Sequence, residues 1–254
     1  MNLTPGLVAS SVPFSVVDGP GSRYVLFLQG CNFNCGACHN PSTIARWPTE
    51  TSTPVEYRTV DDITTELRGI GRLISGITVS GGEATLQLGF LVDLFAAIKT
   101  DHDLNRLSTL VDTNGTPTVE EWERLGPFLD GAMVDLKACS PGLHHKLTGA
   151  GNTSVKDSIR WLSVRGKLTE VRLLVIEGVT DDPEELEAWA EFVSNVDPAT
   201  PVRLMGFRHQ GARKVAKQWP ETSGVALNKA AEALRKLGLA NVTAEMTATS
   251  TTAA

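Results

Sequence analysis

Short runs of apolar residues recur along the chain, and they show little of the alternation that marks a half-exposed strand. The six clearest runs lie at residues 24–28, 76–79, 107–111, 131–134, 171–176 and 202–205. Unalternated runs of this length are typical of strands in a parallel sheet that is buried on both faces. We therefore predict six such strands.

Helical patterns separate the predicted strands. One pattern places Ile63, Leu67 and Ile70 on a single face, another opens with a capping box at residues 118–121, and the last covers residues 228–237. Strand and helix alternate about six times along the chain. This order indicates an α/β fold and a partial or complete barrel.

The composition is that of one globular domain. The chain has 254 residues, of which 41% are hydrophobic and 20% charged, enough to form a single sizeable core. We expect a core domain over residues 23–244, preceded by an N-terminal segment (residues 1–22) and followed by a flexible tail rich in Thr, Ala and Ser (residues 245–254). Residues 41–57 contain three prolines and are predicted to form a loop.

Charge and hydropathy argue against two classes of partner. The net charge is −6 and the chain has no basic block, so we do not expect nucleic acid as a partner. No stretch approaches the roughly 20 apolar residues of a membrane helix, and residues 1–11 do not resemble a secretory leader. We predict a cytoplasmic protein that binds no membrane.

Charged side chains stand at the ends of several predicted strands. Glu83 follows the second strand, Asp112 the third, and Asp135 and Lys137 the fourth. The carboxyl ends of parallel strands in α/β folds meet on one side, where catalytic residues gather. Ordinary turn chemistry does not account for all four residues, so we predict a functional site at these strand ends.

A cluster of cysteines follows the first predicted strand. Cys31, Cys35 and Cys38 give the spacing C-x3-C-x2-C within eight residues. Cysteines this close together, in a compartment that keeps thiols reduced, usually bind metal. Each iron of a [4Fe–4S] cluster takes one outside ligand, so three thiolates would leave one iron open for chemistry.

Two other metal sites are compatible with these residues. Zinc could use the three cysteines with His39, although His39 is adjacent to Cys38 and makes an awkward fourth ligand. Alternatively, Cys139 could close a four-thiolate cluster that only carries electrons. We favour the three-cysteine cluster and interpret Cys139 as a small buried residue.

The motifs taken together resemble the radical SAM superfamily, and within it the glycyl-radical-enzyme activases, which include the pyruvate formate-lyase activases. The resemblance runs from about Pro13 to Gly211, and residues 76–85 are similar to a branch of these activases known in enterobacteria. The motifs that carry it are residues 17–23 (VDGPGSR), 29–31 (QGC), 38–41 (CHNP), 80–84 (SGGEA), 112–115 (DTNG) and 135–137 (DLK).

This resemblance implies a partial (β/α)6 barrel of the radical SAM type and an oxidoreductase that works without oxygen. The cluster would reductively cleave S-adenosylmethionine, and the 5′-deoxyadenosyl radical would abstract a glycine α-hydrogen from a partner enzyme. The partner would be a glycyl radical enzyme, the electron donor flavodoxin or ferredoxin, and the activase a monomer. Residues 40–61 lack further cysteines, so we infer one cluster per chain.

The resemblance also implies roles for individual residues. Asp112 and Asp135 would help form a monovalent cation site, for K⁺ or Na⁺, and Asp18 would contact the partner protein. The family's cofactor-binding histidine aligns with Arg208 rather than His209. The full set of implied cofactor-binding residues is Ala37, Cys38, His39, Gly81, Gly82, Glu83, Asp112, Asp135, Leu136, Lys137, Arg172 and Arg208.

Two other functions stay open from the sequence alone. One is a different radical SAM reaction on a small molecule, such as that of the deazaguanine-forming synthases. The other is a closed-cluster electron carrier that uses Cys139. One departure from the family is Ala37, which stands where the activases often have an aromatic residue. His144 and His145 lie in a polar segment, where we expect them to be exposed.

Overall fold

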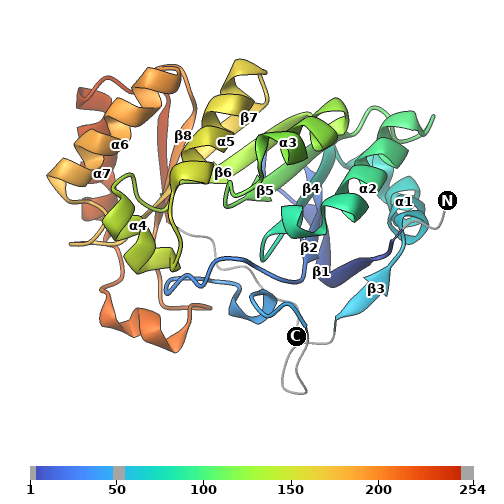
Figure 1. Cartoon of the computed structure of the whole chain (residues 1–254), viewed down its shortest axis with the longest axis horizontal. Coiled ribbons are helices and arrows are strands. Elements are labelled where there is room, and N and C mark those ends of the chain that lie inside the picture. Colours follow the sequence, from blue (N-terminus) through green and yellow to red (C-terminus); the bar gives the residue numbers. More distant parts are fainter. Residues whose placement is uncertain (1–3, 48–54, 247–254) are drawn as a thin grey trace. The chain divides into compact units, whose positions relative to one another are not determined.

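The computed structural model describes residues 4–47 and 55–246, which divide into two compact units (Figure 1). Unit 1 comprises Met1–Asn32 and Ser42–Met133, and unit 2 comprises Phe33–Pro41 and Val134–Ala254. The chain therefore crosses between the units on both sides of residues 33–41.

The described part of unit 1 contains five complete strands and three α-helices, and Figure 1 shows their arrangement. The strands are β1 (Gly6–Ser15), β2 (Arg23–Leu28), β3 (Glu56–Arg58), β4 (Gly76–Gly81) and β5 (Ser108–Thr113). The helices are α1 (Val60–Ile70), α2 (Leu88–Thr100) and α3 (Val119–Leu125). Strand β1 pairs antiparallel with β2 and β3, whereas β2, β4 and β5 run parallel.

The core of unit 1 follows from the unalternated apolar runs. Leu26 of β2 stands beside Val79 of β4, and both side chains are fully buried. A parallel sheet covered on both faces has no exposed side on which polar residues could alternate. Two capping boxes fix the starts of the helices, at Thr59 with Asp62 for α1 and at Thr118 with Glu121 for α3.

Unit 2 repeats the alternation of strand and helix. Its strands are β7 (Leu168–Val175), β8 (Val202–Gly206) and β9 (Val242–Met246), which pair parallel in that order. Its helices are α4 (Pro141–Thr148), α5 (Thr153–Val164), α6 (Pro183–Val196) and α7 (Gly224–Lys236). Helix α6 begins at Pro183, with Asp182 capping the backbone N–H of Glu184, and it buries Trp189 completely.

Strand β6 (Gly131–Asp135) holds residues of both units. Over the described residues the strand order is β3-β1-β2-β4-β5-β6-β7-β8-β9, in which β3 and β9 stand at opposite ends of the sheet order. The α/β class, the six predicted strands and a mostly parallel, open sheet are therefore confirmed. The division into residues 1–22, 23–244 and 245–254 stays a prediction.

The structure adds three strands that the sequence patterns did not indicate, namely β1, β3 and β9. Strand β1 lies inside the predicted N-terminal segment, and β9 extends into the predicted tail as far as Met246. The rest of that tail, residues 247–254, and residues 48–54 of the predicted loop lie outside the described residues. All three added strands are short or partly exposed, so their apolar pattern is weak.

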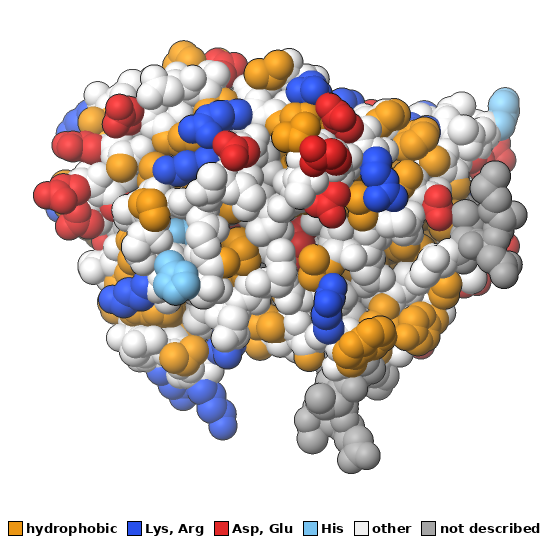
Figure 2. Space-filling view, viewed as in Figure 1, with side chains coloured by type: hydrophobic (Ala, Val, Ile, Leu, Met, Phe, Trp, Pro, Cys, Tyr) orange, Lys and Arg blue, Asp and Glu red, His pale blue; other side chains and the backbone are white. Residues whose placement is uncertain are grey.

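The described surface mixes charged and apolar side chains. Figure 2 shows Lys and Arg interspersed with Asp and Glu, and with hydrophobic side chains, over the face in view. Exposed hydrophobic residues include Phe14, Val16 and Val17, which lie at the end of β1 and just after it. Among the described residues, no helix is long and apolar enough to cross a membrane.

Candidate functional site

A tight turn joins the end of β2 to the first cysteine. Gly30 has φ +101°, a conformation that glycine adopts without strain, and it lies directly before Cys31. The backbone N–H of Gly30 donates to the carbonyl of Thr43 (2.8 Å), and that of Cys31 to the carbonyl of Ile44 (3.0 Å). The segment after residue 42 therefore fixes where Cys31 leaves the sheet.

The glycine pair after β4 lies against this turn. A Cβ on Gly81 would stand 2.1 Å from the Leu28 carbonyl oxygen, and one on Gly82 would stand 2.3 Å from that of Gly30. Gly81 also has φ +127°. Both glycines are therefore required by the approach of β4 to β2, independently of any cofactor.

Glu83 is fully buried at the end of β4 and hydrogen-bonded on both carboxylate oxygens. Its Oε1 accepts from the Thr85 hydroxyl (2.5 Å), the Thr85 N–H (3.1 Å) and the Thr113 hydroxyl (2.8 Å). Its Oε2 accepts from the backbone N–H of Asn114 (2.6 Å). Burial raises the pKa of Glu83, while these donors oppose the rise. Glu83 thus joins the ends of β4 and β5.

The side chain of Asn114 extends this network to the first cysteine. Its Nδ2 donates to Asn32 Oδ1 at 2.8 Å and lies 4.0 Å from the sulfur of Cys31. Its Oδ1 accepts from the backbone N–H of Thr116 (3.1 Å) and from the Thr116 hydroxyl (2.7 Å). Sequence reasoning assigned Asn114 no role, although it lies within the DTNG motif.

Two other acidic residues of unit 1 have separate surroundings. Asp112, at the end of β5, accepts from the Ser80 hydroxyl at 2.9 Å. Asp18 lies between β1 and β2, and its carboxylate accepts from the Ser15 hydroxyl at 2.5 Å. Its backbone carbonyl accepts from Thr78 Oγ1 at 2.7 Å, in the middle of β4. Asp18 is thus held by its backbone, and its side chain is half-buried.

In unit 2, backbone and side-chain bonds hold the segment that carries Cys35 and Cys38. The N–H of Asn34 donates to the Thr148 carbonyl (2.8 Å), at the end of α4. The guanidinium of Arg213 donates to the carbonyls of Asn34 (3.1 Å) and Cys35 (3.0 Å). Sequence reasoning missed Arg213, because its contact lies 178 residues from Cys35.

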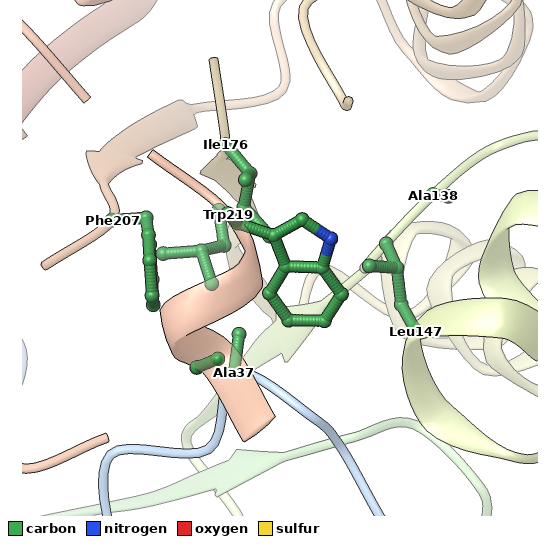
Figure 3. Close-up of a cluster of buried hydrophobic side chains, with 8 residues drawn as sticks. Ala37, Ala138, Leu147, Ile176, Phe207 and Trp219 are labelled. Carbon is green, nitrogen blue, oxygen red and sulfur yellow. The ribbon is translucent and has the colours of Figure 1, made fainter. Parts of the chain in front are cut away.

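An apolar cluster explains the alanine in the cysteine motif. Figure 3 shows the indole of Trp219 among Ala37, Leu147, Ile176 and Phe207. A Cβ on the neighbouring Gly36 would lie 2.7 Å from the Trp219 ring. Trp219 therefore fills this space, and the small residues at positions 36 and 37 leave room for its ring. Trp219 was not identified from the sequence.

The cysteines have the chemistry that an iron–sulfur cluster needs. Cys31, Cys35 and Cys38 are all half-buried. Burial raises the pKa of Cys35 to about 11 and also raises that of Cys38, so both are protonated without metal and would release protons on binding iron. Over residues 4–47 and 55–246, no three Cys, His, Asp or Glu side chains are already gathered as a metal site.

Asp135, Leu136 and Lys137 close β6 and follow it. Lys137 Nζ lies 2.6 Å from Asp135 Oδ2, and both side chains are about one-fifth exposed. The other oxygen, Asp135 Oδ1, is buried, and within the described parts of the chain it has no hydrogen-bond partner. Leu136 is fully buried, and its N–H donates to the carbonyl of Arg172 on β7 (3.0 Å).

Arg172 pairs with a carboxylate on its own strand, β7. Arg172 Nε donates to Glu170 Oε1 at 2.5 Å, and the Arg172 side chain is only 8% exposed. Arg203 of β8 also lies 3.7 Å from Glu170. A salt bridge along β7 therefore accounts for the burial of this arginine.

Arg208 and His209 follow β8 and differ in their contacts. His209 Nε2 bonds to the Trp219 carbonyl (2.8 Å), and its backbone N–H donates to Glu221 (2.7 Å). Arg208 Nε is buried without a hydrogen-bond partner among the residues described, while the Arg208 carbonyl bonds to His39 Nε2 (2.9 Å). His209 is thus held by hydrogen bonds to the loop that follows β8, whereas the Nε of Arg208 can still donate to a ligand.

Two expectations for residues outside the site can be compared with the structure. Cys139 is 4% exposed and its thiol donates to the Ala188 carbonyl (3.1 Å), as expected of a small buried residue. The prediction that His144 is exposed is wrong. Its ring is fully buried, bonds through Nδ1 to the Ala150 carbonyl (3.0 Å) and stands edge-on to Phe33. His145 is exposed, as predicted.

The chain is similar in sequence to proteins of known family. A family model described as the Radical SAM superfamily matches residues 25–192. The pyruvate formate-lyase-activating enzyme of Streptococcus mutans is 36% identical over 214 residues, or 82% of this chain and 80% of that enzyme.

Two solved structures show the same fold. A domain of a pyruvate formate-lyase-activating enzyme from Bacteroides vulgatus has a TM-score of 0.57 at 21% identity, covering 67% of this chain and 99% of that one. QueE from Escherichia coli has a TM-score of 0.60 at 14% identity, covering 95% and 94%.

Proposed function

Because the chain belongs to the radical SAM superfamily, we propose that it activates a glycyl radical enzyme, the activity named in its relatives. When bound, a single [4Fe–4S] cluster and S-adenosylmethionine supply a one-electron cleavage whose 5′-deoxyadenosyl radical takes the α-hydrogen of a glycine in the partner. The chain's own residues must then hold these groups, exclude water and receive the partner's glycine.

The observation that carries this proposal concerns two of the buried polar atoms in unit 2, each at the end of a strand. Asp135 Oδ1 and Arg208 Nε are both buried, and the described residues offer neither a hydrogen-bond partner. Buried polar atoms are nearly always paired in folded proteins, so an unpaired acceptor and an unpaired donor favour a polar ligand. Both residues belong to the set that resemblance assigns to S-adenosylmethionine.

The other residues that the resemblance implies each have a proposed role. Cys31, Cys35 and Cys38 would hold the cluster, and Arg208 would donate to the cofactor in place of the family's histidine. Lys137 would contact the cofactor carboxylate. The other proposed cofactor contacts are Ala37, His39, Asp112, Leu136 and Arg172. Gly81, Gly82 and Glu83 would contact the cofactor in addition to holding β2, β4 and β5 together. Asp135 Oδ1 would also suit a monovalent cation, either K⁺ or Na⁺.

The partner would be a glycyl radical enzyme of the pyruvate formate-lyase kind, and the electron donor flavodoxin or ferredoxin. We propose that the protein is a cytoplasmic monomer. Asp18 would receive the backbone around the partner's glycine, since its carboxylate is half-buried and has the hydroxyl of Ser15 as its hydrogen-bond donor. Its place between β1 and β2 separates it in sequence from the strand-end residues.

The test compares cofactor cleavage with partner activation. Anaerobically reconstituted protein, with about four irons per chain, is reduced with dithionite and mixed with S-adenosylmethionine, with or without pyruvate formate-lyase. We expect 5′-deoxyadenosine in both mixtures, and a glycyl radical doublet in electron paramagnetic resonance only with the partner. Cleavage without a radical would favour a small-molecule substrate, and no cleavage would favour an electron carrier.

The variant Asp18→Asn tests the assignment of the partner contact. It removes one negative charge and leaves the backbone carbonyl that accepts from Thr78. We expect deoxyadenosine release without the partner to stay near the original rate, while glycyl radical formation falls at least tenfold. Ser15→Ala is the matched control, because it removes the hydroxyl donor and keeps the carboxylate. Equal loss of both reactions in Asp18→Asn would assign Asp18 to the fold or the cofactor.

A further inference from the structure

We propose that Asn114 is a positioning residue for the cluster, whose side-chain amide donates to the sulfur of Cys31 and makes the cluster easier to reduce. The inference rests on the proposed function only in requiring that Cys31 ligates iron. All the residues that carry it belong to unit 1. They are Cys31, Asn32, Glu83, Asn114 and Thr116.

The orientation of the Asn114 amide is determined by its neighbours. The backbone N–H of Thr116 can only donate, and it lies 3.1 Å from the amide oxygen of Asn114. An amide turned the other way would set two donors against each other. The NH₂ group must therefore face Asn32 Oδ1, at 2.8 Å, and Cys31 Sγ, at 4.0 Å.

The backbone under this amide is also fixed. The N–H of Asn114 donates to the buried carboxylate of Glu83 at 2.6 Å, and Glu83 accepts at the same time from Thr113 Oγ1. Asn114 itself is only 8% exposed. A group held by this many contacts keeps its direction when its target changes charge, so its dipole is preorganised.

The amide has two N–H bonds and two acceptors. Asn32 Oδ1 takes one N–H, which leaves the second for the sulfur of Cys31. A thiolate is a stronger acceptor than a thiol, so this contact gains strength once Cys31 binds iron. Adding one electron makes the cluster and its sulfurs more negative. A donor at Cys31 therefore favours the reduced form and raises the potential.

A structural role offers a competing explanation. Asn114 could matter only because it ties Asn32, the residue after Cys31, to the end of β5. The two explanations differ for Asn32. If the Asn114 amide acts on the sulfur, Asn32→Ala removes the oxygen that competes with the sulfur for the amide N–H groups. The reduction potential of the cluster should then stay unchanged or rise. If the hydrogen bond between Asn114 and Asn32 is what matters, Asn32→Ala should change the reduction potential as much as removal of the Asn114 amide does.

The experiment is a redox titration of the reconstituted protein without S-adenosylmethionine, followed by electron paramagnetic resonance of the reduced cluster. Asn114→Leu keeps a side chain of similar size and removes the donor. We expect it to disfavour reduction about tenfold, a potential about 59 mV lower for a one-electron couple. Asn114→Asp keeps the oxygen that accepts from Thr116 and adds a charge, so its potential should fall further.

Two results would overturn the proposal. One is a potential in Asn114→Asp equal to that of the unmodified protein, which stays decisive even if Asn114→Leu does not fold. The other is a fall in Asn32→Ala as large as that in Asn114→Leu. Cofactor cleavage and glycyl radical formation are measured separately. A shifted potential without a glycyl radical would refute the proposed function and leave this inference standing.

Discussion

Glu83, at a strand end of unit 1, has hydrogen bonds to both of its oxygens, whereas Asp135 and Arg208, at strand ends of unit 2, do not use all of their polar atoms. Both oxygens of Glu83 accept hydrogen bonds inside a fully buried network. In unit 2, Asp135 and Arg208 each retain a buried atom without a hydrogen-bond partner among the described residues. Glu83 has a structural role, since its hydrogen bonds join the ends of β4 and β5. Asp135 and Arg208 each retain a polar atom that can bind a ligand.

The unpaired buried atoms of Asp135 and Arg208 reduce the stability of the fold. An unsatisfied buried polar group costs about 1–3 kcal/mol, so a fold that retains such groups is less stable than it could be. Proteins commonly accept this cost at functional sites. Removal of Glu83 and removal of Arg208 should therefore have opposite consequences for stability, and the first two predictions below examine that contrast.

The largest expected effect is on stability at Glu83. Glu83→Leu would leave the backbone N–H groups of Thr85 and Asn114 buried without acceptors. At about 1–3 kcal/mol for each N–H, the free energy of unfolding should fall by roughly 2–6 kcal/mol. Urea unfolding of the cluster-free protein measures this. Glu120→Leu, at an exposed position on α3, is the control and should change little. An unchanged midpoint for Glu83→Leu would refute the framework role.

The next effect is on cofactor binding at Arg208. Arg208→Ala removes a guanidinium whose Nε has no described partner, so the stability of the cluster-free protein should not fall. Affinity for S-adenosylmethionine should fall about ten- to a hundredfold, because a charge-assisted contact contributes about 1.5–3 kcal/mol. Calorimetric titration of the reconstituted protein measures the affinity.

Arg160→Ala is the matched control for Arg208→Ala. Arg160 is on α5, where its exposed side chain bonds to Asp157, and its loss should change neither the stability nor the affinity for the cofactor. If Arg208→Ala destabilised the cluster-free protein as Glu83→Leu is expected to do, Arg208 and Glu83 would not differ in role. Arg208 would then be a structural residue and not one reserved for a ligand.

The smallest effect concerns pH. Burial lowers the pKa of His144 in the folded protein, so the unfolded chain binds more protons at mildly acidic pH. Stability should therefore fall as the pH drops below about 6.5, the ordinary histidine value. His144→Asn should show a shallower fall in urea midpoint between about pH 6.5 and 5. His145→Asn, at an exposed position, should follow the original curve. Identical slopes for all three proteins would refute the prediction.

The sequence was most informative about the buried parallel strands. Unalternated apolar runs predicted β2, β4, β5, β6, β7 and β8, because burial on both faces leaves a continuous signal. Strands β1 and β9 were missed because they alternate or lie among serine, threonine and proline. The polar residues at strand ends could be identified because parallel strands place their carboxyl ends together.

The contacts within the site were beyond sequence reasoning. Asn114 stands in a recognised motif, but its role depends on an amide orientation that the backbone of Thr116 sets. Trp219 fills the space beside Gly36, although the two residues lie far apart in the chain. Spacing rules predict which residues share a motif. They do not predict which distant side chain fills a gap or satisfies a carbonyl.

The contact between Arg213 and the cysteine segment has a consequence for synthesis. The Arg213 guanidinium donates a hydrogen bond to the carbonyl of Asn34, which lies 179 residues earlier in the chain. At about 5–20 residues per second, the ribosome would expose Asn34 roughly 10 to 35 seconds before Arg213. During that interval the nascent chain carries its cysteines without the hydrogen bonds from Arg213 that hold the cysteine segment. Iron delivery to the finished chain should therefore be more productive than delivery during translation.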